Sequence, residues 1–129
     1  EMRFIEAEAK LRNGDAGGAA TAHNDAVKAS IMQVTGASDA TYEGMYASET
    51  GASITLEKIM YQKWVALFAQ VEAYSDWRRT GFPTLTANPN AVFSPASIPL
   101  RLPTIQDERL YNPNATVVGD ITLPVWWDN

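Results

Sequence analysis

Residues 62–83, QKWVALFAQVEAYSDWRRTGFP, form the stretch of sequence that decides the fold. Apolar residues recur there at spacings of three and four, and further apolar and small residues widen the stripe beyond that of an ordinary amphipathic helix. The pattern stops at Gly81-Phe82-Pro83, where the chain turns out of the helical region. The stretch therefore predicts one long helix, from about Ile54 to Arg79, that is packed on nearly all sides.

The N-terminal part predicts a helical hairpin. Residues 2–12 have helical periodicity, and Asn13-Gly14 is a stop signal because glycine tolerates the left-handed conformation that closes a helix. Asp15 can accept hydrogen bonds from the free N–H groups that begin a second helix, which should run to about Thr35 and end at Gly36. The periodicity places Phe4, Ala7, Glu8 and Leu11 on one face of the first helix, with Ile5 and Ala9 beside them.

The second helix is rich in small residues. Each glycine costs a helix interior about 1 kcal/mol relative to alanine, so Gly17 and Gly18 predict a neighbour pressed close to the backbone. The hairpin is typical of tetratricopeptide-type units, although no second copy follows at a spacing of about 34 residues. The loop at 36–53 is expected to hold a short helical turn around Ala40–Ala47.

Beyond Gly81 the sequence changes character, because residues 82–129 contain all seven prolines. Helical periodicity is lost there, and we expect an extended segment that wraps over the helical part at 1–81. Its anchors would be Ile98, Leu100, Leu102, Val125, Trp126 and Trp127. The predicted class is mainly α: a tetratricopeptide-like hairpin plus a long packed helix, with an irregular extended C-terminal segment.

Composition narrows the possible functions. The chain has 129 residues, enough for one domain, and a net charge of −5, which argues against nucleic acid as a partner. It has no cysteine, so disulfides, thiolate catalysis and cysteine–zinc sites are excluded. No apolar run approaches the roughly 18 residues that a membrane-spanning helix needs. We expect no metal and no cofactor, since no phosphate loop or metal motif is present.

The polar residues favour structural roles over catalysis. His23 lies mid-helix without partners at helical spacing for a metal site or a catalytic triad. A glycosidase needs two carboxylates across a sugar, and sequence spacing nominates no such pair. Asp76, Arg78 and Arg79 at a helix end are expected to hold elements together, with arginine forking onto a carboxylate or onto carbonyls of segment 98–112.

Two tryptophans near the C-terminus are the candidate ligand contacts. Trp126 or Trp127 could offer an aromatic platform to the apolar face of a sugar ring. Adjacent residues of an extended segment point to opposite sides, so only one of them can face a ligand. The alternative is that both anchor the tail to the core.

Four pieces of the sequence occur in the order expected of one family. They are FIEAEAKLRNGD at 4–15, VKAS at 27–30, IMYQKWVALFAQVEAYSDWRRTGFP at 59–83, and a tail made of IPLRLP at 98–103, Glu108, Asn112 and PVWWD at 124–128. On these pieces the chain resembles the C-terminal part of the SusD/RagB-like outer-membrane proteins, in the SusD-like branch. It departs from the family at Thr104-Ile105, where Tyr-Pro is usual, and at His23, where a bulkier hydrophobic or aromatic residue is common.

The resemblance implies a surface lipoprotein of a Gram-negative outer membrane, held by an N-terminal lipid that lies outside this chain. Family members are several times longer, so residues 1–129 would be a C-terminal fragment. The implied partner is a SusC-type TonB-dependent transporter, and the implied ligand is an oligosaccharide or, in some branches, a peptide. The family's glycan-contacting aromatics lie largely in parts that this chain lacks, so none is carried over by motif.

Three hypotheses follow. The first is a non-enzymatic nutrient-binding subunit without a cofactor, in which capture depends on stacking and hydrogen bonds. The second is a helical-repeat scaffold that binds another protein and has no role with sugars. The third, a glycoside hydrolase or its accessory domain, has no feature of the sequence in its favour.

Overall fold

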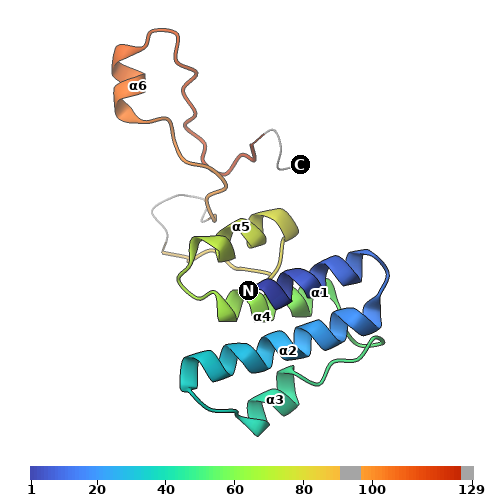
Figure 1. The fold of residues 1–129 in the computed structure, drawn as a ribbon. Coiled ribbons are helices and arrows are strands. Elements are labelled where there is room, and N and C mark those ends of the chain that lie inside the picture. The colour runs from blue at the N-terminus through green and yellow to red at the C-terminus, as the bar shows by residue number, and fades with distance from the viewer. Residues whose placement is uncertain (91–96, 126–129) are drawn as a thin grey trace. The chain divides into compact units, whose positions relative to one another are not determined.

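The computed structural model describes residues 1–90 and 97–125 (Figure 1). Its helices are α1 (Met2–Arg12), α2 (Ala16–Thr35), α3 (Ala40–Tyr46), α4 (Leu56–Ala66), α5 (Val71–Thr80) and α6 (Gln106–Tyr111). Neither range contains a β-strand, which confirms the predicted mainly α-helical class. The chain divides into two compact units, Glu1–Pro83 and Thr84–Asn129.

The predicted hairpin is formed by α1 and α2. Gly14 has a φ of +83°, the left-handed conformation that allows the chain to reverse between the helices. The carboxylate of Asp15 accepts a hydrogen bond of 2.8 Å from the N–H of Gly18 and so caps α2. At its other end α2 stops at Gly36, whose N–H bonds to the carbonyl of Met32. The turn, the cap and the terminator are thus confirmed.

The two glycines near the start of α2 differ in what surrounds them. The loop before α4 lies against the helix, so that a Cβ on Gly51 would come within 3.1 Å of the backbone nitrogen of Gly17. The chain therefore approaches α2 closely, but the approach requires glycine at 51: a Cβ on Gly17 itself would meet nothing within 4 Å, so the prediction that Gly17 answers a close neighbour is wrong. At Gly18 a Cβ would come within 2.1 Å of the capping carboxylate of Asp15, so the cap itself excludes a side chain there.

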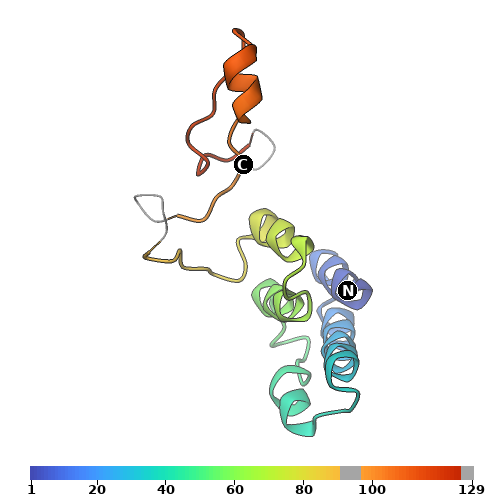
Figure 2. The same cartoon turned by 90° about the vertical axis from the view of Figure 1, so that its left-hand side faces the viewer.

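The core of the first unit lies between α1, α2 and α4, which Figures 1 and 2 both show side by side. Alanines on α2 let the larger side chains of α1 and α4 approach closely. The buried core residues are Phe4, Ala7, Ala20, Ala22, Ala26, Val27, Ala47, Ile54, Ile59 and Met60. This core fixes the relative positions of the helices that line both cavities described below.

The predicted long helix is wrong, because the chain breaks between α4 and α5. Leu67 to Gln70 form a turn in which Ala69 has a left-handed φ of +62°. In one straight helix, Lys63 and Asp76 would stand about 20 Å apart along the axis, at 1.5 Å per residue. Their charged groups instead lie 2.6 Å apart. Tertiary contacts of α5 therefore override a sequence that contains no helix breaker at this point.

The expectation that this region is packed on nearly all sides is also wrong. Ile59 and Met60 are buried, whereas Phe68 and Val71 at the break are 83% and 78% exposed. Tyr61 and Val65 on α4 are also exposed. The wide apolar stripe is thus divided between a core face and a solvent-facing side of unit one.

Replacing Ala69 with glycine is expected to raise the free energy of unfolding by about 0.5 kcal/mol. The left-handed conformation costs a residue with a Cβ about 1–2 kcal/mol, whereas glycine loses about 0.5–1 kcal/mol more entropy on folding. Urea denaturation checks the difference. The matched control is Ala29→Gly in the middle of α2, which should lower the free energy of unfolding by about 1 kcal/mol. An equal loss of stability in both variants would contradict a strained Ala69.

The second unit contains a short helix that the sequence analysis missed. Its six-residue helix α6 lies between two irregular segments, and the N–H of Leu100 donates a hydrogen bond of 2.8 Å to the carbonyl of Ile121. The hydroxyl of Thr104 accepts from the N–H of Val118 at 2.9 Å. Residues 97–125 therefore form a closed loop with its own hydrogen bonds. The wrapping of residues 82–129 over the helices stays a prediction.

Candidate functional site

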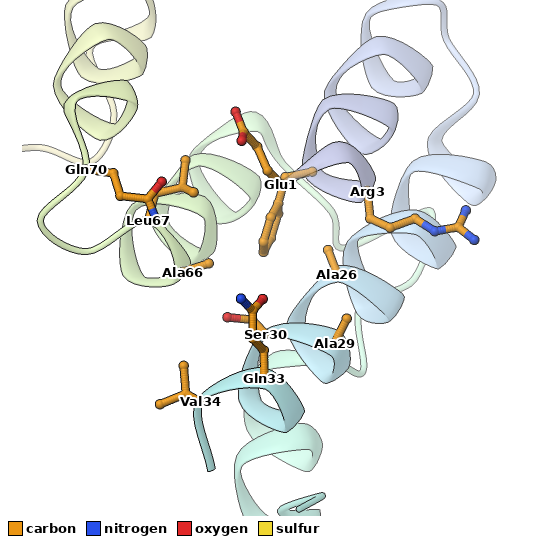
Figure 3. Close-up of a pocket in the computed structure, with 11 residues that line it drawn as sticks. Glu1, Arg3, Ala26, Ala29, Ser30, Gln33, Val34, Ala66, Leu67 and Gln70 are labelled. Carbon is orange, nitrogen blue, oxygen red and sulfur yellow. The ribbon is translucent and has the colours of Figure 1, made fainter. Parts of the chain in front are cut away.

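One cavity in unit one lies beside the start of α1 and the turn between α4 and α5 (Figure 3). It has a volume of about 480 Å³. Ser30 and Gln33 project into it from α2, and Leu67 and Gln70 line it from the turn, whereas Arg3 points away in Figure 3. Its lining offers amide and hydroxyl groups over an apolar floor. The only carboxylate in the lining is Glu1.

The second cavity lies between α2, α3 and α4 and has a volume of about 500 Å³. We call it the tyrosine pocket. Its lining residues are His23, Met45, Tyr46, Glu49, Glu57, Lys58, Tyr61 and Gln62. Two aromatic rings, a thioether and several hydrogen-bonding groups therefore meet in one hollow.

His23 connects α2 to α3 at the base of the tyrosine pocket. It is 1% exposed, and its Nε2 lies 3.1 Å from the carbonyl oxygen of Tyr46. A carbonyl only accepts, so Nε2 carries the proton and Nδ1 of the neutral ring is an acceptor. Nδ1 has no hydrogen-bond partner among the described residues. Burial lowers the pKa of His23.

Gln62 has a similar position on α4. The hydroxyl of Tyr42 donates to its Oε1 at 3.0 Å, and the Tyr42 ring packs on that of Tyr46 with centroids 4.8 Å apart. Its Nε2, a donor, is buried and has no partner in the described part of the chain. The wall of the tyrosine pocket thus contains one unmet donor and one unmet acceptor.

The loop at the rim is held to α2 by Asn24. Its Nδ2 donates to the carbonyl of Glu49 at 2.8 Å, and its Oδ1 accepts from the N–H of Glu49 at 3.0 Å. The Glu49 side chain is in turn 2.8 Å from Nζ of Lys58. Although burial acts to raise it, hydrogen bonds from Lys58 and Ser53 hold the pKa of Glu49 below its usual value. Glu49 is therefore a carboxylate, unsuited to donate a proton.

A separate ionic cluster, made of Glu8, Lys63, Asp76 and Arg79, connects α1, α4 and α5. Arg79 forks onto the carboxylate of Glu8, with Nη2 2.8 Å from Oε2, and also donates to Asp76 at 2.8 Å. Asp76 pairs with the buried ammonium of Lys63 at 2.6 Å. The predicted holding role of Arg79 is confirmed, with Glu8 as the carboxylate onto which it forks. The carboxylates and the cationic groups of this ionic cluster neutralise one another, so the cluster is structural.

The stability of the first unit is expected to fall at mildly acidic pH through His23. Its folded pKa is lower than the unfolded value of about 6.5. The contribution of His23 to the free energy of unfolding is therefore fully present above the unfolded pKa. It is lost as the pH falls through the folded pKa. Denaturant titrations across this window, compared with His23→Leu, check the effect. If the free energy of unfolding of His23→Leu fell equally steeply with pH across this window, the effect could not be assigned to His23. Carboxyl groups titrate lower, near pH 4, and would not cause it.

The structure does not place the two ligand-contact candidates that the sequence analysis named. Trp126 and Trp127 lie outside the described residues. The tyrosine pocket was missed, although Tyr42 and Tyr46 stand four apart and so share a helix face. Among the described residues, no group of three or more histidine, aspartate or glutamate side chains is arranged to hold a metal ion.

Comparison with known proteins identifies the family. No curated protein and no solved structure matches the chain. None of the helices in the described ranges has the length and hydropathy of a membrane-crossing segment. A family model described as starch-binding and associating with the outer membrane matches residues 1–103. The chain therefore belongs to the SusD-like family.

Proposed function

We propose that this chain acts in the non-catalytic capture of oligosaccharides at the outer-membrane surface, as part of a lipid-anchored protein. The match of the starch-binding family model to residues 1–103 carries this proposal. The two cavities of the first unit, each of about 500 Å³, are within the range of small-ligand sites, about 300–1,000 Å³. Binding would depend on stacking and hydrogen bonds, with no bond broken.

Three acidic residues of the first unit have lowered pKa values. A glycosidase needs one carboxyl group with a raised pKa to protonate the leaving group. Hydrogen bonds from Arg79 lower the pKa of Glu8, and hydrogen bonds from Lys10 and Arg3 lower that of Glu6. Glu49, the acid held in the tyrosine pocket, is likewise lowered. These carboxylates suit ion pairing.

The proposed partner is a SusC-type TonB-dependent transporter of the same membrane. This partner and the lipid anchor rest on membership of the family. Affinity purification of the tagged protein from its own cell envelope should recover the transporter. Recovery of the protein without any transporter, from envelopes in which the transporter is present, would contradict the pairing.

Calorimetric titration with a glycan panel tests the binding function. The panel should include maltoheptaose for starch and a peptide digest for the alternative nutrient class. Saturable binding of a glycan without release of shorter sugars supports the proposal. The absence of binding to every glycan would remove it, and steady release of reducing ends would show an enzyme instead.

A helical-repeat scaffold without a sugar role is the second candidate. The observation in its favour is the exposed apolar side of α4 and the following turn, where Tyr61, Val65, Phe68 and Val71 face solvent. Such a surface is typical of a protein-binding face. A protein partner whose binding is lost in Phe68→Ser, together with no glycan binding by the wild type, would favour this candidate.

A further inference from the structure

We propose that the tyrosine pocket between α2, α3 and α4 is a subsite for one ring of an oligosaccharide, with Tyr61 as its stacking platform. This inference rests on the proposed glycan-binding function and adds the location of a site and the residues that form it. The pocket belongs entirely to the first unit.

The aromatic side chains are suited to a sugar ring. Tyr61 is 49% exposed and Tyr46 is 38% exposed, so each presents part of its ring surface to the pocket that it lines. The C–H face of a pyranose is apolar, while its edge is ringed with hydroxyl groups. An amphipathic tyrosine accommodates both properties, because its ring is apolar and its hydroxyl is polar. Met45 adds an adaptable apolar contact.

The pocket is held in shape before any ligand arrives. Tyr46 packs on Tyr42, and its carbonyl accepts the hydrogen bond of His23. Tyr42 is anchored in turn on Gln62 of α4. On the opposite rim Asn24 fixes the backbone of Glu49 through two hydrogen bonds. Preorganisation of this kind reduces the entropy lost on binding.

The polar groups match a neutral polyhydroxylated ligand better than an anionic one. Lys58 is already paired with Glu49 at 2.8 Å, and Glu57 adds a further carboxylate to the lining. The pocket therefore has no unpaired positive charge to attract a phosphate or another anion. Carboxylates and an ammonium group can still accept from and donate to sugar hydroxyls.

Two polar atoms of the inner wall lack hydrogen-bond partners among the described residues. His23 Nδ1 needs a donor, and Gln62 Nε2 needs an acceptor. A hydroxyl group provides both roles, and a sugar carries several. Both atoms are closed off from solvent in this conformation, so they add to the polarity of the wall without bonding to a ligand directly.

The test is titration of the 129-residue chain with maltoheptaose, followed by calorimetry and by amide chemical-shift mapping. Tyr61→Ala is expected to weaken binding about tenfold, in line with the loss of one aromatic contact. Tyr61→Trp should retain binding, because a larger ring replaces the platform. Tyr111→Ala is the matched control, since Tyr111 is an exposed helical tyrosine of the second unit and should leave the affinity unchanged.

The outcomes separate the site from the function. Chemical-shift changes at Tyr46, Lys58 and Tyr61, together with the tenfold loss, support the subsite. Binding by the wild type with unchanged affinity in a folded Tyr61→Ala variant would overturn the subsite and leave the proposed function standing. Shifts that cluster instead at Ser30 and Gln70 would place the ligand in the first cavity. If the wild type binds no glycan, the proposed function fails and the subsite fails with it.

Discussion

Replacing Phe4 with alanine is expected to lower the free energy of unfolding of the first unit by about 4 kcal/mol, a typical cost for a phenylalanine in a core. Phe4 is 1% exposed, and its ring meets the edge of His23 with centroids 6.1 Å apart. It belongs to α1 and lies where the hairpin packs against α4. The helices around it cannot collapse fully into the space that the missing ring would leave. Urea denaturation monitored by helical circular dichroism measures the loss.

Two variants of α1 make the Phe4 result specific. Phe4→Leu keeps most of the apolar volume and should cost about 1.5 kcal/mol at most. Met2→Ala removes a side chain that is 77% exposed and should change stability by no more than about 0.5 kcal/mol. A loss below about 1 kcal/mol in Phe4→Ala, well short of the cost expected for a packed core position, would contradict the core assigned to this residue.

The N-terminal hairpin could be predicted because local signals determine it. Asp15 as a cap, Gly14 in the turn and Gly36 as a terminator each act within one turn of the chain, and each has the predicted role. The short helix α3 lies where a helical turn was expected. Such features depend on backbone conformation and neighbouring hydrogen bonds, which sequence reports directly.

The break between α4 and α5 could not be predicted in the same way. No glycine or proline stands between Ile54 and Arg79, and alanine at position 69 favours a continuous helix. The left-handed Ala69 is tolerated because the turn lets α5 pack on α4 and brings Arg79 to Glu8, 71 positions away. A long-range contact of this kind has no periodic signature in the sequence.

The tyrosine pocket was beyond sequence reasoning for the same reason. Its lining comes from three helices and a loop, and His23 and Gln62 meet there although neither position is near the other in the chain. The sequence analysis looked instead for aromatics in the tail, at Trp126 and Trp127, which lie outside the described residues. The aromatic platform that the sequence analysis offered for a sugar, at Trp126 or Trp127, stays a prediction.

Replacing Arg79 with alanine is expected to lower the free energy of unfolding by about 2 kcal/mol. Loss of one partner from a buried ion pair costs about 3–5 kcal/mol, but Arg79 is 48% exposed and solvent screening reduces the effect. The variant leaves Glu8, which is 7% exposed, paired with Arg12 alone. Thermal and urea denaturation measure the change, and Lys28→Ala on the exposed side of α2 is the control with no expected effect.

Arg79→Ala should also make the free energy of unfolding depend less steeply on pH in the acidic range. The hydrogen bond from Arg79 is the main cause of the lowered pKa of Glu8. A lowered folded pKa means that the stabilisation is present above the unfolded pKa of about 4.3 and is lost as the pH falls through the folded value. Without Arg79 this loss becomes smaller, whereas the loss assigned to His23, which begins as the pH falls through its unfolded pKa of about 6.5, remains. An unchanged acid limb in Arg79→Ala would show that Glu8 is held by Arg12, and that α5 is fixed by Asp76 and Lys63 instead.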